Sequence, residues 1–326
     1  MKKITLLIIL LVTGFMTIYA GPVSKHGSLK VKGKQLVDQT GQSVVLRGVS
    51  FGWSNWWPQY YNPDAVYCLT KDWQCSVLRA AMGVEPDSAY ISDPQPQIDL
   101  VTTVVEAAVK NDIYVIIDWH SHGIRTDEAV KFFQRMATKY GQYPNVIYEI
   151  FNEPVQTWDE VKNYSETVIR AIRAIDKDNI ILVGNPHWDQ DIHIVADNPI
   201  TGFENIMYTL HFYAATHKKW LIERGDYALR NNIPIFVSEC ASMEASGDGA
   251  LDLESWNMWL RWMEANQISW VCWSVSPKGE SCSMMQWEAD PRGPWRDKDL
   301  KEWGIITRDI IRKMNKEQDI KPEPSK

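Results

Sequence analysis

Apolar and polar positions along the chain follow two periods in turn. Short runs rich in β-branched and aromatic residues are typical of buried strands, and the longer stretches between them repeat apolar residues at helical spacing. Strands are expected at residues 44–49, 76–81, 113–119, 146–152, 180–184, 206–211, 235–239 and 270–273. Helices are expected at residues 63–71, 98–111, 126–140, 158–175, 218–231, 253–267 and 303–314. Eight strands with helical crossovers predict an α/β fold, the (β/α)8 TIM barrel.

The segments outside this alternation define the rest of the organisation. Residues 26–42 alternate and turn like a small N-terminal β-hairpin, which is expected to plug the bottom of the barrel. Residues 316–326 are charged and contain proline, so we expect a disordered tail there. No second domain is visible in the sequence, and residues 21–315 are therefore assigned to one domain.

The first twenty residues resemble a targeting signal. Lys2 and Lys3 precede an apolar run over residues 4–12, and the run continues more weakly to Ala20. This pattern predicts a signal peptide cleaved after Ala20 and a secreted protein, either extracellular or periplasmic. An uncleaved membrane anchor is the alternative, because the apolar stretch is close to the shortest that spans a bilayer.

Composition limits the classes of function. With 326 residues, 45% of them hydrophobic and 23% charged, the chain is long enough to bury one large core. The net charge of −7 provides no basic surface for nucleic acid, and we expect a monomer. Five cysteines are too few for a disulfide framework. Pairing of Cys68 with Cys75 stays open, whereas Cys240 and Cys272 are expected to be small buried side chains.

Two of the predicted strands end in a glutamate. An apolar run over residues 146–151 is followed by Asn152 and Glu153, and Pro154 then ends strand pairing. A second apolar run ends in Glu239. Because the carboxyl ends of the strands form the active rim of such a barrel, both carboxylates are expected there. A glycosidase needs two such groups, one as general acid and the other as nucleophile or base.

Polar and aromatic residues close the other predicted strands as well. They are Arg79, His120, His122, His187, Trp188, His211, Tyr213 and Trp273. Arg79 and the hydroxyl of Tyr213 would favour the charged form of Glu239. Glu153 must keep its proton to act as the acid. Alternatively, Arg79 neutralises Glu149 in a structural ion pair inside the barrel.

Two residues beside the glutamates are expected to hold the reacting sugar. Asn152 would bind the hydroxyl next to the reacting carbon, a contact that strengthens as the transition state forms. Trp273 would offer an apolar face to the sugar ring. This chemistry requires no cofactor and no metal.

Together these residues resemble glycoside hydrolase family 5, and most closely its endo-β-1,4-glucanase, or cellulase, branch. The resemblance covers residues 27–314 and rests on six stretches: 46–50 (LRGVS), 77–84 (VLRAAMGV), 115–120 (VIIDWH), 147–154 (IYEIFNEP), 210–213 (LHFY) and 236–239 (FVSE). The chain departs from the family at Gly52, where many relatives carry a histidine. It also departs at Cys240 and Ala241, where many carry an aromatic residue and glycine.

The resemblance implies Glu153 as acid/base and Glu239 as nucleophile. The shell that it implies around the reacting sugar is Arg79, His120, Asn152, His211, Tyr213 and Trp273. The outer contacts that it implies are Trp56 in the glycone half of the cleft, Trp188 in the aglycone half, and Lys278 with Glu280 beyond the reacting sugar. It also implies that residues 21–315 are a glycoside hydrolase catalytic domain.

These features predict a secreted, retaining endo-β-1,4-glucanase that cuts cellulose or related β-glucans through a covalent glycosyl-enzyme on Glu239. Its expected partner is a β-glucan polysaccharide, with no nucleic acid and no stable membrane insertion after signal cleavage. A β-mannanase or xyloglucanase of the same family is an alternative. A metal-dependent barrel hydrolase is another, and its ligands would be His120, His122, His187 and His211. A binding protein without activity is disfavoured because both glutamates are present.

Overall fold

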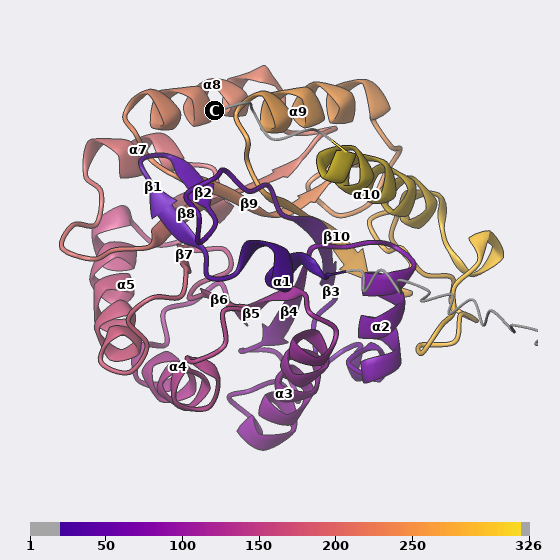
Figure 1. Ribbon diagram of the computed structural model, residues 1–326, viewed down its shortest axis with the longest axis horizontal. Coiled ribbons are helices and arrows are strands. Elements are labelled where there is room, and N and C mark those ends of the chain that lie inside the picture. The colour runs from indigo at the N-terminus through magenta and orange to yellow at the C-terminus, as the bar shows by residue number, and fades with distance from the viewer. Residues whose placement is uncertain (1–19, 321–326) are drawn as a thin grey trace, which may run out of the picture.

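Eight parallel strands close into a barrel in the computed structural model, which describes residues 20–320 (Figure 1). They are β3 (Arg47–Phe51), β4 (Val77–Gly83), β5 (Tyr114–His120), β6 (Val146–Glu149), β7 (Ile181–Val183), β8 (Ile206–Tyr213), β9 (Ile235–Ala241) and β10 (Trp270–Val275). Each strand pairs with the next in sequence, and β10 pairs with β3 to close the ring. The predicted (β/α)8 TIM barrel is confirmed.

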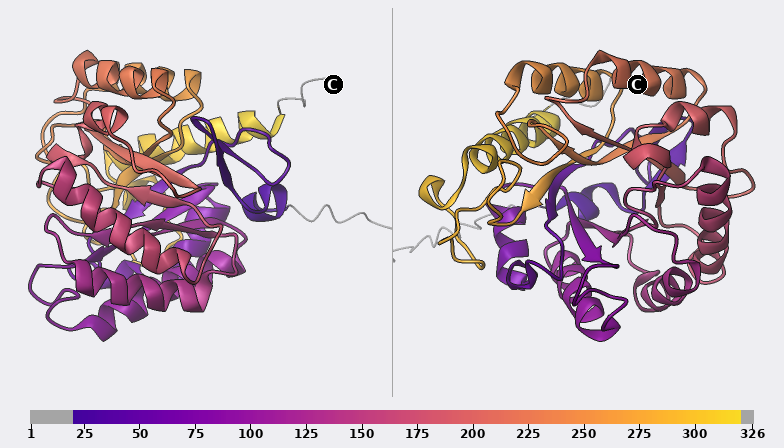
Figure 2. Two further views of the ribbon diagram at one scale, coloured as in Figure 1. Left: turned by 90° about the vertical axis from the view of Figure 1, so that its left-hand side faces the viewer. Right: turned by 180° about the vertical axis from the view of Figure 1, so that it is seen from behind.

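Helices connect the strands and surround the barrel (Figures 1 and 2). They are α2 (Pro63–Lys71), α3 (Pro94–Lys110), α4 (Thr126–Tyr140), α5 (Trp158–Arg173), α6 (Pro186–Asp189), α7 (Ile192–Asp197), α8 (Lys219–Arg230), α9 (Leu253–Ala265) and, after the last strand, α10 (Glu302–Ile320). Local signals fix where they begin. The Asn62 side chain accepts from the backbone of Asp64 and Ala65 at α2, and Glu160 accepts from the Thr157 backbone at α5.

The N-terminal segment closes the bottom of the barrel. It consists of α1 (Pro22–His26) and the antiparallel pair β1 (Lys30–Lys32) and β2 (Gln35–Val37). Leu36 of β2 belongs to one buried apolar cluster with barrel residues that include Tyr114. The Tyr114 hydroxyl also donates to the Gly27 carbonyl at 2.6 Å. The predicted hairpin is thus present as a plug, and the opposite rim is left for the functional residues.

Apolar side chains fill the space between the strands and the helices. Trp259 of α9 stacks on Phe212 of β8, with ring centroids 3.9 Å apart. Parallel strands that are covered on both faces have continuous apolar sequences, and for this reason the strands could be predicted from the sequence. All five cysteines are buried free thiols, so Cys68 and Cys75 are not bridged, and Cys240 and Cys272 are buried as expected.

The ends of several strands differ from the sequence-based bounds in ways that matter for the site. β8 and β9 each run two residues further than expected, so Tyr213 and Glu239 lie within regular strands. β6 ends early, at Glu149, but the chain still follows β5 beyond it. Asn152 N donates to Trp119 O at 3.1 Å, and this contact positions the residue at the rim.

The C-terminal helix corrects one expectation. α10 continues to Ile320, so residues 316–320 are helical rather than the start of a disordered tail. Lys, Glu and Gln in this stretch are good helix formers, and Gln318 Oε1 accepts from Arg47 Nη1 at 2.5 Å. The rest of the predicted tail, residues 321–326, and nearly all of the predicted signal peptide, residues 1–19, lie outside the described residues. No helix among residues 20–320 is long and apolar enough to cross a membrane.

Candidate active site

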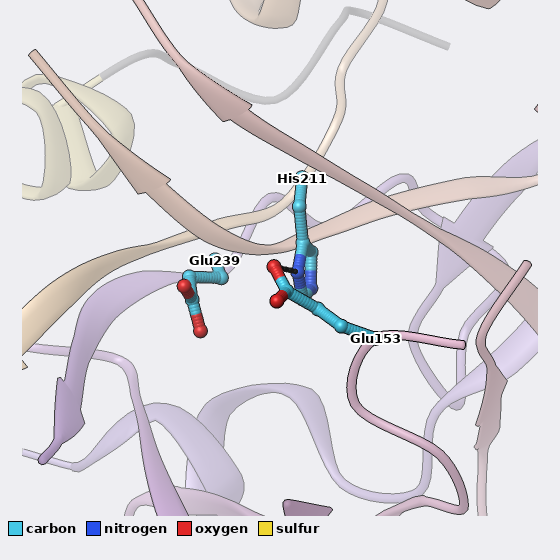
Figure 3. Close-up of side chains that lie close together, drawn as sticks. All are labelled: Glu153, His211 and Glu239. Atoms are coloured by element: carbon cyan, nitrogen blue, oxygen red, sulfur yellow. Dashed lines mark hydrogen bonds and ion pairs between the residues drawn. The ribbon is translucent and has the colours of Figure 1, made fainter. Parts of the chain in front are cut away.

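Glu153 and Glu239 approach each other at the carboxyl ends of the barrel strands (Figure 3). Glu239 lies in β9, and Glu153 follows β6, where its backbone N–H donates to Ser121 O at 3.2 Å. One carboxylate oxygen from each glutamate and one ring nitrogen of His211, from β8, all lie within 4.8 Å of one another. The two strand-end glutamates therefore share one site, as the sequence predicted.

Both carboxylate oxygens of Glu239 are held by hydrogen bonds. The Tyr213 hydroxyl donates to Oε1 at 2.7 Å, and Arg79 Nη1 donates to Oε2 at 3.0 Å. Burial raises the pKa of Glu239 and the nearby charge of Glu153 raises it further, while Arg79, His211 and Tyr213 oppose that rise. The expected contacts of Arg79 and Tyr213 with Glu239 are present, and they orient the carboxylate as well as stabilise its charge.

Arg79 is fully buried beneath the two glutamates and contacts four acidic or amide side chains. Its guanidinium lies 2.7 Å from Glu149 and 3.0 Å from both Asp118 and Glu239. It also donates to Asn152 Oδ1 at 2.6 Å. Burial alone would lower the pKa of Arg79, but these three carboxylates raise it well above its usual value. The structural pair with Glu149 and the contact with Glu239 thus occur together rather than as alternatives.

Glu153 is contacted by two histidines. His211 Nδ1 lies 3.0 Å from Oε1, and His122 Nε2 lies 3.2 Å from Oε2. Burial would raise the pKa of Glu153, but the hydrogen bonds and charges of the two histidines outweigh burial and lower it to about 2. In the free site the surroundings therefore favour a carboxylate at Glu153, contrary to the expectation of a protonated acid. The same contacts raise the pKa values of both imidazoles, because each of them faces the Glu153 carboxylate.

The other ring nitrogen of His211 faces a second set of polar groups. Nε2 lies 2.9 Å from Ser238 Oγ and 3.3 Å from Asp189 Oδ2, a fully buried carboxylate. Burial would lower the pKa of His211, but Asp189, Glu149 and Glu153 raise it well above its usual value. His211 is thereby held as a cation between the acid and the barrel interior.

Asp189 reaches this position through an unusual backbone. His187, Trp188 and Asp189 all have left-handed φ angles, of 59°, 54° and 60°. Such a run is unfavourable for residues other than glycine and is held by specific contacts. Asn185 N donates to Asp189 Oδ1 at 2.6 Å, and Trp188 N donates to Pro154 O at 3.1 Å. Sequence reasoning missed Asp189, because no local pattern signals that a short helix will turn this side chain inward.

His120 lies on the opposite side of the site and supports Trp273. Its Nδ1 lies 2.7 Å from Asp118 Oδ2, and its ring stacks on that of Trp273 with centroids 5.1 Å apart and an angle of 2°. Trp53, which the sequence did not single out, packs its ring edge-on against His120 at 4.3 Å. Burial lowers the pKa of His120 and the charge of Arg79 lowers it further, so the ring is neutral. One face of Trp273 is therefore covered by His120.

Of the outer residues implied by the family resemblance, Trp188 lines the hollow that contains the glutamates, and Trp56 and Lys278 line a second one. One hollow, of about 440 Å³, is lined by Trp188 together with Glu153, Tyr213 and Glu239. The other, of about 470 Å³, is lined by Asn55, Trp56, Trp57 and Lys278. Lys278 lies over the Trp56 ring, 5.9 Å from its centroid, and pairs with Glu280 at 2.6 Å. Trp56 and Trp188 are 46% and 44% exposed, so a ligand can reach both rings.

A family model described as Cellulase (glycosyl hydrolase family 5) matches residues 37–279, which include both glutamates. The chain belongs to glycoside hydrolase family 5. Among its relatives, Endoglucanase Z of Dickeya dadantii is 42% identical over 80% of this chain and 61% of its own length. An endoglucanase of Clostridium saccharobutylicum is 39% identical over 90% of this chain and 66% of its own length. The chain thus spans about two thirds of these relatives or less.

Solved structures of similar proteins agree with this family 5 assignment. A protein from Cytophaga hutchinsonii superposes with a TM-score of 0.90 at 45% identity, covering 92% of this chain and 99% of that one. The catalytic domain of the Thermobifida fusca endoglucanase Cel5A (E5) has a TM-score of 0.85 at 31% identity, covering 90% of this chain and 99% of that one. The barrel described above is therefore the family 5 barrel.

The histidines of the alternative metal site are not gathered around one point. Within residues 20–320, the only group of three or more side chains placed to hold a metal ion is Glu153, His211 and Glu239, and it contains one of the four histidines. Of the three others, His120 pairs with Asp118 and His187 with Asp191, outside that group, while His122 contacts Glu153 at the carboxylate oxygen that His211 does not use. The geometry therefore favours the carboxylate pair of family 5 over a histidine metal centre.

His122 offers a test of how the site distributes its acid proton. Replacing it with phenylalanine keeps a ring beside Trp53, on which His122 stacks at 5.8 Å, but removes the hydrogen bond and charge that lower the pKa of Glu153. The pKa of Glu153 should then rise, so Glu153 keeps its proton to higher pH. The expected result is that the alkaline limb of kcat/KM moves to higher pH, which a pH–rate profile measures. His187→Phe removes an exposed histidine from the same rim, and its alkaline limb should stay in place.

Proposed function

We propose that this family 5 chain is a secreted endo-β-1,4-glucanase that hydrolyses internal bonds of cellulose or related β-glucans with retention of configuration. The observation that carries the proposal is the approach of the Glu153 and Glu239 carboxylates, with oxygens within 4.8 Å. Retaining glycosidases separate these groups by about 5–5.5 Å and inverting ones by about 6.5–9.5 Å. The relatives named as endoglucanases support the substrate class, as does the Thermobifida fusca variant bound to cellotetraose, 30% identical to this chain.

The first step would transfer the glucan chain to Glu239. Tyr213 and Arg79 fix the carboxylate, so that one of its oxygens attacks the anomeric carbon as the bond to the leaving sugar breaks. Glu153 gives the leaving oxygen a proton, which it draws from His211 through their 3.0 Å contact. The proton thus belongs to the Glu153–histidine pair, and the pair titrates as a unit.

The second step would return the enzyme to its resting state. Glu153, now a carboxylate, takes a proton from a water molecule as the water oxygen attacks the anomeric carbon of the glycosyl-enzyme, and it passes this proton back to His211 through their 3.0 Å contact. The bond to Glu239 breaks, and the carboxylate returns to its hydrogen bonds with Tyr213 and Arg79. Two displacements at one carbon give a product with the configuration of the substrate.

The surrounding side chains would hold the reacting sugar. Arg79 Nη2 donates a hydrogen bond to Asn152 Oδ1 at 2.6 Å. The N–H groups of the Asn152 amide are then the ones that can donate to the sugar hydroxyl next to the reacting carbon. Trp273 is covered on one face by His120 and would offer its other face to the ring. Both contacts depend on residues from other strands, which hold the two groups in one orientation.

Reducing-end release from carboxymethyl-cellulose, mixed-linkage β-glucan and β-mannan tests the proposal directly. The protein should cut the two glucans, and the isosteric variants Glu153→Gln and Glu239→Gln should lose that activity while remaining folded by circular dichroism. Release from mannan alone would replace the glucanase with a mannanase of the same family. Activity that survives in Glu239→Gln would show that the carboxylate pair does not perform the reaction.

Secretion is the remaining part of the proposal. It is supported by the basic and apolar leader that precedes Ala20. Cleavage after Ala20 would leave Gly21 as the first residue. N-terminal sequencing of the exported protein should therefore begin at Gly21.

A further inference from the structure

Trp287 is a large apolar side chain that the fold holds in solvent. It is 69% exposed, the highest fraction among the large hydrophobic residues of the described part of the chain. Its neighbours two positions away, Met285 and Ala289, are buried. The turn is fixed by backbone hydrogen bonds from Gln286 N to Asp299 O at 2.9 Å and from Ala289 N to Gln286 O at 3.2 Å. The indole is therefore presented to water by a turn that backbone hydrogen bonds hold in place.

This indole adjoins the hollow on the Trp56 side of the active site. The rings of Trp287 and Trp57 pack edge to face, with centroids 6.2 Å apart and an angle of 86° between their planes. Trp57 lines the hollow together with Trp56. Trp56 in turn lies 4.8 Å from Trp53, whose ring packs on His120 of the catalytic site. Ring contacts therefore connect His120 to Trp56 through Trp53. Trp57, which lines the same hollow as Trp56, contacts Trp287.

We propose that Trp57 and Trp287 form an additional sugar-binding platform at the outer end of the glycone half of the cleft. The platform would hold sugar units of the same β-glucan chain, beyond those that occupy the hollow at Trp56. This inference rests on the proposed glucanase function. Indole rings give large contact area with the flat apolar face of a pyranose at little conformational cost, which suits a chain of equatorially linked sugars.

The charges around the platform are of both signs. Glu288 and Asp290 are exposed beside Trp287, but so is Arg292, and Lys278 lines the adjoining hollow. The two indole rings therefore supply the contact area that the proposal needs, and no net charge at this end selects a charged polymer. The segment that carries Trp287 lies beside α2, where Asn62 Nδ2 donates to Pro291 O at 3.1 Å (Figure 1). This segment is thus held against the start of α2.

Substrate length separates the contribution of the platform from the chemistry. For Trp287→Ala, we expect kcat/KM on nitrophenyl β-cellobioside, which is too short to reach the platform, to equal that of the unmodified enzyme. We expect kcat/KM on cellohexaose to fall about 3- to 10-fold, as loss of one stacking contact implies. Trp287→Phe should recover most of this loss. Tyr143→Ala removes an exposed aromatic residue in the loop that leads into β6, at the bottom rim of the barrel, and should change neither value.

The outcomes distinguish this inference from the proposed function. If the unmodified protein cuts neither substrate, the glucanase proposal fails. If it cuts both, but Trp287→Ala hydrolyses cellohexaose at the unmodified rate, the platform is wrong and the glucanase proposal stands. An equal loss on the short and long substrates would also overturn the platform, because it would show a structural effect on the catalytic site. Binding of cellohexaose to the Glu239→Gln variant, with and without Trp287→Ala, repeats the comparison without turnover and should show the same loss.

Discussion

Replacing Glu239 with alanine is expected to lower kcat/KM for dinitrophenyl β-cellobioside by at least about 10⁴-fold, since the group that attacks the anomeric carbon is removed. The variant leaves a space beside Tyr213 and Arg79 that a small anion can enter, because both donors remain. Added azide should therefore restore turnover by attacking the sugar directly. A single displacement inverts the carbon, so the product should be an α-glycosyl azide, which proton NMR identifies.

Glu153→Ala is the matched control for this experiment. Dinitrophenolate leaves without a proton, so the glycosyl-enzyme on Glu239 should still form, and its hydrolysis should become slow because the base is missing. Azide should then attack the glycosyl-enzyme and give a β-glycosyl azide after two displacements. The two variants are thus expected to give opposite anomers. The same anomer from both would contradict the assigned roles, and an α-product from Glu153→Ala would mean that the roles are exchanged.

Most of the fold could be predicted from the sequence because the barrel strands are buried on both faces. Their apolar runs are interrupted by turns and helices at regular intervals, and this periodicity identifies the strands without tertiary information. The residues at which the strands end were predicted less accurately, because a strand ends where its pairing with the neighbouring strand ends. β6 ends at Glu149 as its pairing with β7 runs out, and β8 reaches Tyr213 because β9 accompanies it to Ala241.

The position of the two carboxylates could be predicted for a similar reason, since position at a strand end is a local property. The groups that set their protonation could not. Asp189 acts on His211 only because three left-handed residues turn it inward, and Trp53 reaches His120 across the barrel rim. Histidines from two other segments lower the pKa of Glu153, which was expected to keep its proton, and this effect depends on distances that no spacing in the sequence encodes.

Arg79 is expected to be the residue in this site whose loss costs the most stability. It is fully buried and pairs with Asp118, Glu149 and Glu239, which are buried as well. Arg79→Met removes the one cation that contacts all three of these carboxylates, and breaking a buried pair in this way costs about 3–5 kcal/mol of unfolding free energy. Urea denaturation followed by the fluorescence of the sixteen tryptophans measures the change.

The pH dependence and a second arginine make this prediction specific. Burial already raises the pKa of Asp118 above its ordinary value, and without Arg79 this pKa rises further, while the pKa of Glu149, which Arg79 helps to lower, rises as well. The folded variant should then bind more protons than the unfolded one. Its unfolding free energy should therefore be highest in acid and fall as pH rises, and its deficit against the unmodified protein should widen toward neutral pH. Arg308 is also buried, but its partners Asp297 and Asp309 are exposed, so Arg308→Met should cost less than about 1 kcal/mol. Equal losses from the two variants, or a deficit for Arg79→Met that does not change with pH, would show that packing around the side chain matters and its charge does not.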